Sequence, residues 1–302
     1  MSGPSAAGGG RAAALLPVLA AIGTAVLVGA SMVATRFVIA ETDPASLALM
    51  RYAIGVVCLA PAVLLGGRVR FAARDLLPIA LLGIGQFGIL IALLNYGLQF
   101  MPAARGALIF ATLPLMTMTL AAALGYEAPT WPKVLGVLLT ILGVGLALLE
   151  KATAGGAAGW LGELAVLACT ACGAVCSVFY RPYLRKYPAL PVSAVAMLAS
   201  VLFLAVPAAS EGFFDALPRF SALGWGAVLF IGIGSGAGYY LWLWALQHTT
   251  PTRVTVFLSL NPFVATALGA WLLAEPITPP FLAGLGAVMA GLWLAHWRRE
   301  PG

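Results

Sequence analysis

The sequence contains ten long runs in which apolar side chains predominate and charged side chains are nearly absent. A helical run of about 20 apolar residues matches the thickness of a bilayer's hydrocarbon core. The runs are continuous blocks of Leu, Ala, Val and Gly rather than short alternating segments, so they predict helices and not a transmembrane barrel. The ten predicted spans are 14–35, 45–66, 76–99, 103–125, 131–149, 160–180, 190–210, 222–247, 252–274 and 280–297.

Charged residues are too scarce to cover the surface of a water-soluble protein of this length. Asp, Glu, Lys and Arg make up 9% of the 302 residues, against roughly 25% in ordinary soluble domains. This scarcity excludes a soluble enzyme, a disordered chain and a nucleic-acid-binding protein, although the net charge is +6. The predicted fold class is an all-α integral membrane protein with ten transmembrane helices.

The N-terminal residues 1–13 are rich in Gly, Ala and Ser, and we expect them to form a disordered tail. The uncharged stretch from Ala12 to Thr35 is longer than the apolar core of a signal peptide, which spans about 7–15 residues. We therefore interpret it as a transmembrane helix. The connections between the later runs are short and carry Pro or Gly, so they leave no room for a separate soluble domain.

The distribution of Lys and Arg predicts the orientation of the chain. An even number of spans places both termini on one side, and that side carries eleven of the 16 Lys and Arg residues. The opposite side carries the other five, which are Arg36, Arg51, Arg105, Lys151 and Arg219. Because Lys and Arg are enriched in cytoplasmic loops, we expect both termini to be cytoplasmic.

The sequence repeats itself at an offset of 148 residues. Six identities recur at this offset in the same order: Gln99 and Gln247, Arg105 and Arg253, Pro114 and Pro262, Glu127 and Glu275, Gly136 and Gly284, Gly143 and Gly291. They predict two five-helix repeats, residues 14–150 and 151–302. Because five spans per repeat is an odd number, the two repeats must insert in opposite orientations. Such an inverted repeat is typical of carriers that work by alternating access.

The repeated signature resembles that of the drug/metabolite transporter superfamily, in its ten-helix EamA-type branch. The likeness rests on Arg105, Pro114, Glu127 and Gly136, which recur as Arg253, Pro262, Glu275 and Gly284, and on Arg51 in the second helix. It covers essentially the whole chain. The first helix departs from the family, because it keeps only Gly29 of a Trp-Gly-Ser-Asn segment and has Arg36 in place of a lysine.

The resemblance implies a secondary transporter, not an enzyme, that exports small metabolites across the bacterial inner membrane. Amino acids, above all aromatic and hydrophobic ones, are the implied cargo, and no cofactor or metal is implied. The implied path is lined by helices 1, 3, 4, 6, 8 and 9, with helices 5 and 10 as scaffold. The expected partners are a small-molecule substrate and the lipid bilayer, with no nucleic acid. The alternatives are a channel-like uniporter and a proton-coupled exporter of other small organic solutes.

Aromatic and amide side chains in the predicted spans are candidates for substrate binding. Tyr240, Trp244 and Gln247 share one face of a helix at spacings of four and three. Tyr96 and Gln99 occupy the corresponding turn of the first repeat. Buried amides in lipid face the bundle interior, although they can equally bridge helices while the aromatics form an interfacial belt. The further candidates are Ser31, Asn261, Cys176 and Tyr180.

Prolines in the middle of two predicted spans are candidate hinges. Pro114 and Pro262 each free a backbone carbonyl one turn earlier, and nearby hydroxyl groups can bond to it. The alternative is a static kink. The charged residues of the repeat, Arg105, Arg253, Glu127 and Glu275, lie near helix ends, where they predict interfacial anchors and ion pairs, or a gate.

Arg51 lies nearer the interior of its predicted span than the other arginines. It would suit a substrate that carries a carboxylate, or it pairs with Glu41 or Asp43; the sequence leaves both open. No Asp or Glu lies in the middle of a predicted span, so the membrane carboxylate that serves proton exchange in related four-helix exporters is missing. A facilitator or exchanger is therefore favoured, ahead of coupling through His248 or an acid at a helix end.

An intramembrane enzyme is the rival class. It would need a buried Ser/His pair, paired aspartates or a metal cluster. The only histidines, His248 and His296, lie near helix ends, and Cys169-x-x-Cys172 has no histidine nearby. We therefore expect neither catalysis nor metal binding.

Overall fold

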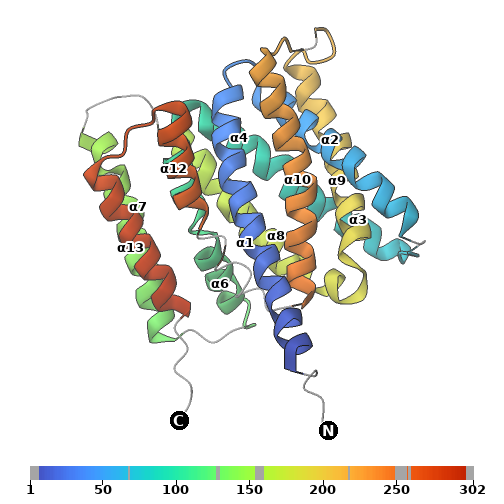
Figure 1. Cartoon of the computed structure of the whole chain (residues 1–302), viewed down its shortest axis with the longest axis horizontal. Helices are drawn as coiled ribbons and strands as arrows, with labels where there is room; N and C mark the ends of the chain where they lie inside the picture. The colour runs from blue at the N-terminus through green and yellow to red at the C-terminus, as the bar shows by residue number, and fades with distance from the viewer. Residues whose placement is uncertain are drawn as a thin grey trace.

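The computed structural model describes residues 7–66, 69–126, 130–153, 160–216, 218–248, 257 and 260–296, and in these residues all regular structure is helical. Figure 1 shows the helices as a bundle. The elements are α1 (Ala7–Val38), α2 (Pro44–Leu65), α3 (Ala73–Gly83), η1 (Ile84–Ile89), α4 (Leu90–Phe100), α5 (Ala103–Phe110), α6 (Leu113–Ala123), α7 (Trp131–Thr153), α8 (Leu161–Lys186), α9 (Ala189–Ser210), α10 (Ala222–His248), α12 (Asn261–Leu273) and α13 (Pro279–His296).

Where the structure describes them, the predicted spans are helical, as expected. In the described part of the chain, eight helical segments are long and apolar enough to cross a membrane. Elements α3, η1 and α4 form one such span, and α5 with α6 forms another. The last two predicted spans correspond to the shorter apolar helices α12 and α13. With 13 residues, α12 is about 20 Å long, less than the ~30 Å of a hydrocarbon core.

One boundary differs from that expected, and another cannot be compared. Helix α1 begins at Ala7, inside the segment 1–13 that the sequence assigns to a tail. Helix α12 covers residues 261–273 of the predicted span 252–274, and of the residues before it in that span only 257 and 260 are described.

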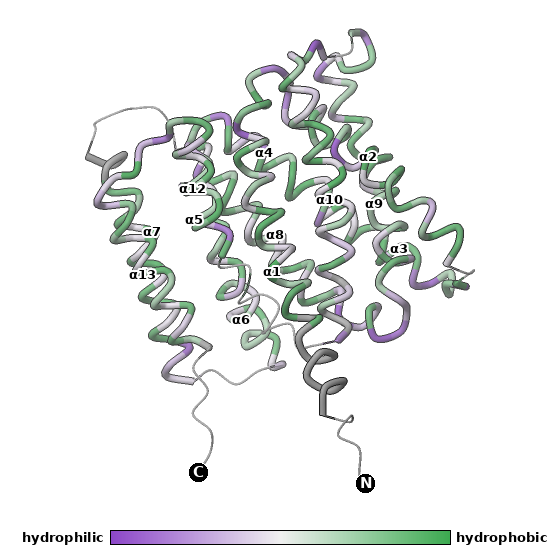
Figure 2. Tube along the Cα trace, in the orientation of Figure 1, coloured by the Kyte–Doolittle hydropathy of each residue, from purple (hydrophilic) through white to green (hydrophobic). Residues whose placement is uncertain are grey.

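The outer surface of the bundle is apolar, as a lipid environment requires. Large side chains such as Leu65, Val206 and Trp271 are exposed on it. Figure 2 shows hydrophobic residues along the helices and hydrophilic ones concentrated at the helix ends and connections. The chain is therefore a multi-pass membrane protein. The first turn of α1 and the last turn of α13 lie at the same end of the bundle (Figure 1).

Helices α7 and α13 pack against each other at one edge of the bundle (Figure 1). A Cβ added to Gly136 would lie 2.5 Å from the carbonyl oxygen of Gly291, and one added to Gly284 would lie 2.4 Å from that of Gly143. The glycines thus let the two backbones touch. At the offset of 148 residues, Gly136 corresponds to Gly284 and Gly143 to Gly291. The contacts between Gly136 and Gly291 and between Gly284 and Gly143 are therefore equivalent in the two halves.

Helix starts recur at the same offset. Helix α6 begins at Leu113 and α12 at Asn261, while α7 begins at Trp131 and α13 at Pro279. In the first half the predicted proline kink is a full break, because α5 ends at Phe110 and α6 starts afresh with Pro114 in its first turn. The hydroxyl of Thr112 donates to the Ile109 carbonyl at 2.7 Å, which satisfies one carbonyl at this break.

Candidate functional site

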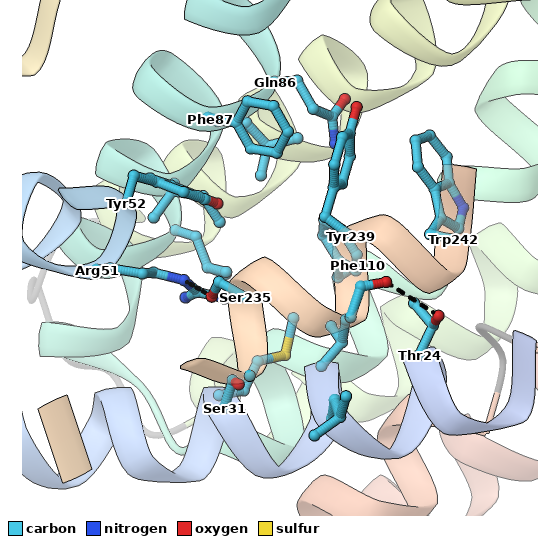
Figure 3. A pocket seen from close by; sticks show the side chains of 18 of the residues that line it. Thr24, Ser31, Arg51, Tyr52, Gln86, Phe87, Phe110, Ser235, Tyr239 and Trp242 are labelled. Carbon is cyan, nitrogen blue, oxygen red and sulfur yellow. Dashed lines mark hydrogen bonds between the residues drawn. The ribbon is translucent and has the colours of Figure 1, made fainter. Parts of the chain in front are cut away.

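A pocket lies in the interior of the bundle, between α1, α2, η1, α4, α5, α6 and α10 (Figure 3). It encloses about 760 Å³ of empty space, including the part open to the outside. Most of the wall is apolar, contributed by residues such as Leu27, Met32 and Leu90. Helices of both halves of the chain therefore enclose it.

Arg51 on α2 is the one charged residue among the described residues that line this pocket. Its side chain is buried, with 7% of the residue exposed. The Nε atom donates to the hydroxyl oxygen of Ser235 on α10 at 2.5 Å, as Figure 3 shows. The Ser235 hydroxyl donates in turn to the Ile231 carbonyl at 2.6 Å, and the guanidinium carbon lies 5.7 Å from the centre of the Tyr52 ring.

The carboxylates that the sequence offered as partners of Arg51 do not pair with it. Glu41 accepts from the backbone N–H and the hydroxyl of Ser221, both at 2.8 Å. Asp43 forms no ion pair with Arg51 either. In the described part of the chain, the guanidinium therefore has no counter-ion. Its hydrogen bond to Ser235 and its contact with the Tyr52 ring are the interactions that stabilise its charge.

Close packing of α2 on α10 brings Arg51 to Ser235. A Cβ added to Gly232 would lie 2.6 Å from the Cβ of Ile54, and one added to Gly236 would lie 3.1 Å from the Gly55 carbonyl oxygen. The glycines of α10 thus remove the side chains that would hold the helices apart. Thr24 on α1 also reaches α10, because its hydroxyl donates to the Gly238 carbonyl at 3.1 Å.

A π-helical segment, η1, supplies Gln86 and Phe87 to the pocket. Its glycines pack closely on the opposite side: a Cβ added to Gly85 would lie 3.0 Å from the Cys176 Sγ, and one added to Gly88 would lie 2.9 Å from the Phe203 ring. The wider turn of a π-helix changes which side chains share a face, and such turns are frequent at functional sites. Here the turn separates a packing face of glycines from the two residues that line the pocket.

Aromatic rings line the pocket beside the arginine. Phe87 packs between Tyr52 and Tyr239, with ring centres 4.9 Å and 4.2 Å away, and Tyr239 packs on Trp242 at 5.2 Å. Two buried polar atoms of the lining residues, the Gln86 Oε1 and the Trp242 Nε1, have no hydrogen-bond partner among the described residues. Unpaired buried polar groups are costly, so these atoms are available to bind a polar solute.

Of the sequence-predicted site residues, the structure brings Ser31 and Arg51 to the pocket. Tyr240 and Trp244 do not line it, and the Trp244 ring instead stacks on His248 at 4.2 Å. The pocket-facing residues of α10, Ser235, Tyr239 and Trp242, have the same four-and-three spacing shifted by five residues. On an α-helix this shift is a rotation of about 140°, so the structure moves the candidate pocket to another face of α10. The Gln247 side chain lies outside the described residues.

Other predicted binding residues also lie away from the pocket lining. The Tyr96 ring packs on Phe100 at 5.1 Å, and the backbone carbonyl of Gln99 accepts from the Nη1 of Arg36 at 3.4 Å. Asn261 is fully buried at the start of α12, and both of its side-chain polar atoms lack hydrogen-bond partners among the described residues.

Cys176 and Tyr180 on α8 lie behind the pocket wall rather than in its lining. The Cys176 thiol donates to the Leu82 carbonyl at 3.7 Å, and the Cys172 thiol donates to the Gly85 carbonyl at 3.3 Å. Both carbonyls belong to the stretch where the helix becomes π-helical, so the thiols satisfy acceptors there. Tyr180 is fully buried, and its hydroxyl interacts electrostatically with that of Tyr239.

The charged residues of the repeat occupy helix ends. The nearest Arg105 and Glu163 atoms lie 4.0 Å apart. The Glu275 carboxylate accepts from the backbone N–H groups of Ala103 and Ala104 at 2.8 Å and 3.4 Å. Glu275 therefore caps the N-terminus of α5, where a negative charge is favourable. Glu127 and Arg253 lie outside the described residues.

Comparisons with known proteins agree with this architecture. The sequence matches the EamA-like transporter family twice, over residues 15–149 and 160–297. It is 31% identical to a "probable terminal-alkyne amino-acid exporter" of Streptantibioticus cattleyicolor, over 84% of each chain. It is 27% identical to a "probable amino-acid metabolite efflux pump" of Salmonella typhimurium, over 74% of this chain and 79% of that one.

A transporter of Archaeoglobus fulgidus is 27% identical over 90% of this chain and 95% of that one. One crystal structure has the same fold, with a TM-score of 0.69, 21% identity and coverage of 95% of this chain and 96% of that one. Together, the two family matches cover nearly the entire sequence. The chain belongs to the EamA-like transporter family.

Proposed function

We propose that this transporter is a secondary carrier that exports amino acids from the cytoplasm across the bacterial inner membrane, with aromatic and hydrophobic amino acids favoured. The observation that carries the proposal is the interior pocket, which combines one buried arginine with a row of aromatic rings. Two relatives whose names refer to export or efflux of amino acids or their metabolites support the substrate class.

The proposed mechanism is alternating access by two five-helix halves of opposite orientation. Supporting it, the helix starts and the glycine contacts of α7 and α13 repeat at the offset of 148 residues. The pocket draws α1, α2, η1, α4, α5 and α6 from one half and α10 from the other. Rocking one half against the other would therefore open the pocket to alternate sides while Arg51 and the aromatic rings hold the solute.

The direction of export rests on the predicted orientation. The excess of Lys and Arg on the side of both termini favours a cytoplasmic location for them. The start of α1 and the end of α13 lie at the same end of the bundle, which is consistent with both termini being on one side of the membrane (Figure 1).

Transport of radiolabelled solutes by purified protein in liposomes tests the proposal. We expect faster movement of phenylalanine, leucine or other apolar amino acids than in protein-free liposomes, and little movement of sugars or polyamines, because the pocket wall is apolar and its one charge is positive. Transport of no amino acid in a broad panel would contradict the proposed function.

A further inference from the structure

We propose that Arg51 and Ser235 form a carboxylate subsite, and that a carboxylate attached to an apolar body, rather than an amino group, is what this pocket requires of its substrate. The inference rests on the transport function proposed above and specifies its substrate class. It includes amino acids, but also monocarboxylates that lack the amine.

The first argument is the cost of burying the guanidinium. Arg51 is 7% exposed within a membrane-spanning helix, and no carboxylate in the described part of the chain pairs with it. A buried charge without a counter-ion is strongly disfavoured in a medium of low polarity. The hydroxyl of Ser235 and the ring of Tyr52 compensate only in part. A substrate that supplies a negative charge would complete the site.

The second argument is geometry. The Ser235 hydroxyl uses its proton on the Ile231 carbonyl, so its oxygen lone pair is what accepts from the Arg51 Nε. This pair of bonds fixes the guanidinium against α10 and uses one of its donors. The terminal N–H groups have no protein partner among the described residues, and the side chain lines the pocket. A planar guanidinium held in this way offers paired donors that match a carboxylate.

The third argument is the absence of a matching site for an amine. None of the described residues that line the pocket is Asp or Glu. The groups available to an ammonium are neutral, such as the unpaired Gln86 Oε1 and the aromatic faces of Phe87 and Tyr239. A carboxylate neutralises the buried arginine, whereas a ligand that carries only an ammonium meets a charge of its own sign at low dielectric. The pocket therefore distinguishes the two ends of an amino acid.

Three probes of one shape separate these contributions. Binding of L-phenylalanine, 3-phenylpropanoate and 2-phenylethylamine to the purified protein is measured by thermal shift and calorimetry. We expect the first two to bind and the amine to bind at least about tenfold more weakly than 3-phenylpropanoate, because charge-assisted hydrogen bonds are lost. Tighter or equal binding of 2-phenylethylamine would overturn the proposal.

Variants locate the subsite. Arg51→Gln is expected to weaken 3-phenylpropanoate binding at least about tenfold, with a smaller loss in Arg51→Lys, which keeps the charge but not the paired donors. The control is Arg74→Gln. The Arg74 side chain is 84% exposed, so this substitution should leave binding unchanged. Unaltered binding in a folded Arg51→Gln protein would overturn the proposal.

The outcomes are distinct from those that test transport. If Arg51→Gln fails to fold, Arg51→Lys and the comparison of the three probes on the unmodified protein still decide the proposal. Amino-acid transport without any preference for the carboxylate would contradict the subsite alone. Carboxylate binding without transport in liposomes would support the subsite and contradict the proposed function.

Discussion

Gly234→Phe is expected to reduce amino-acid transport to near the background of protein-free liposomes while the protein still inserts and folds. Gly234 lies on the pocket wall, on α10. A Cβ there would meet only the Leu27 Cδ2 at 3.7 Å and the Ser31 Oγ at 3.8 Å, which are ordinary contact distances. The backbone therefore tolerates the substitution, and the aromatic ring takes up space that a substrate needs.

Gly226→Phe is the matched control on the same helix. Gly226 is exposed, and nothing lies within 4 Å of a Cβ added to it, so the ring would enter lipid. Initial rates of labelled-substrate uptake into liposomes, normalised to the amount of reconstituted protein, compare the two variants. Wild-type transport by Gly234→Phe would show that the pocket is not the transport path.

Gly143→Leu and Gly284→Leu are expected to destabilise the protein by similar and large amounts. The added Cβ would lie 2.7 Å from the Gly284 carbonyl oxygen in the first case and 2.4 Å from the Gly143 carbonyl oxygen in the second. Both obstacles are backbone atoms, so α7 and α13 must separate. Overpacking of this kind typically costs about 1–3 kcal/mol, and thermal unfolding in detergent measures the loss.

The same helices provide the controls. Gly145→Leu and Gly286→Leu lie two residues from the contact positions, and nothing lies within 4 Å of a Cβ added at either one. Leu also favours helix more than Gly does, so these variants should keep the stability of the natural protein. Equal destabilisation at all four positions would contradict the packing described for α7 and α13.

Much of the fold could be predicted from the sequence, because a lipid solvent imposes strong constraints. Each backbone polar group must be satisfied inside its own helix, so the apolar runs directly indicate helices. The repeat in the sequence also predicts where equivalent helices begin. Gly136 and Gly284 are 148 residues apart, and so are the first residues of α7 and α13.

The candidate pocket was predicted less well, because α10 carries aromatic residues on more than one face. Tyr240 and Trp244 have the spacing of a common face, and so do Tyr239 and Trp242 with Ser235. Which face turns inward depends on tertiary packing, here the contacts of Gly232 and Gly236 with α2. The glycine run around these residues was the signal in the sequence, since close helix contacts need small residues.

The contribution of η1 was not predictable from helical periodicity. An α-helical pattern assigns faces at 3.6 residues per turn, and a π-helical turn breaks that register. The visible sign was the cluster of Gly83, Gly85 and Gly88, whose packing on α8 and α9 leaves Gln86 and Phe87 to line the pocket. For Arg51 the sequence left open whether it suits a substrate carboxylate or pairs with Glu41 or Asp43. Only the structure shows that neither acid pairs with it, because that depends on their positions in space.

Counterflow across liposome membranes tests the central claim, that a single interior pocket opens to alternate sides. Liposomes containing the purified protein are loaded with unlabelled phenylalanine and diluted into labelled phenylalanine. A carrier that returns faster with substrate bound should take up label faster, and to a transient excess, than in liposomes loaded with buffer. Uptake of label at the same rate with and without internal phenylalanine would indicate an open pore and contradict alternating access.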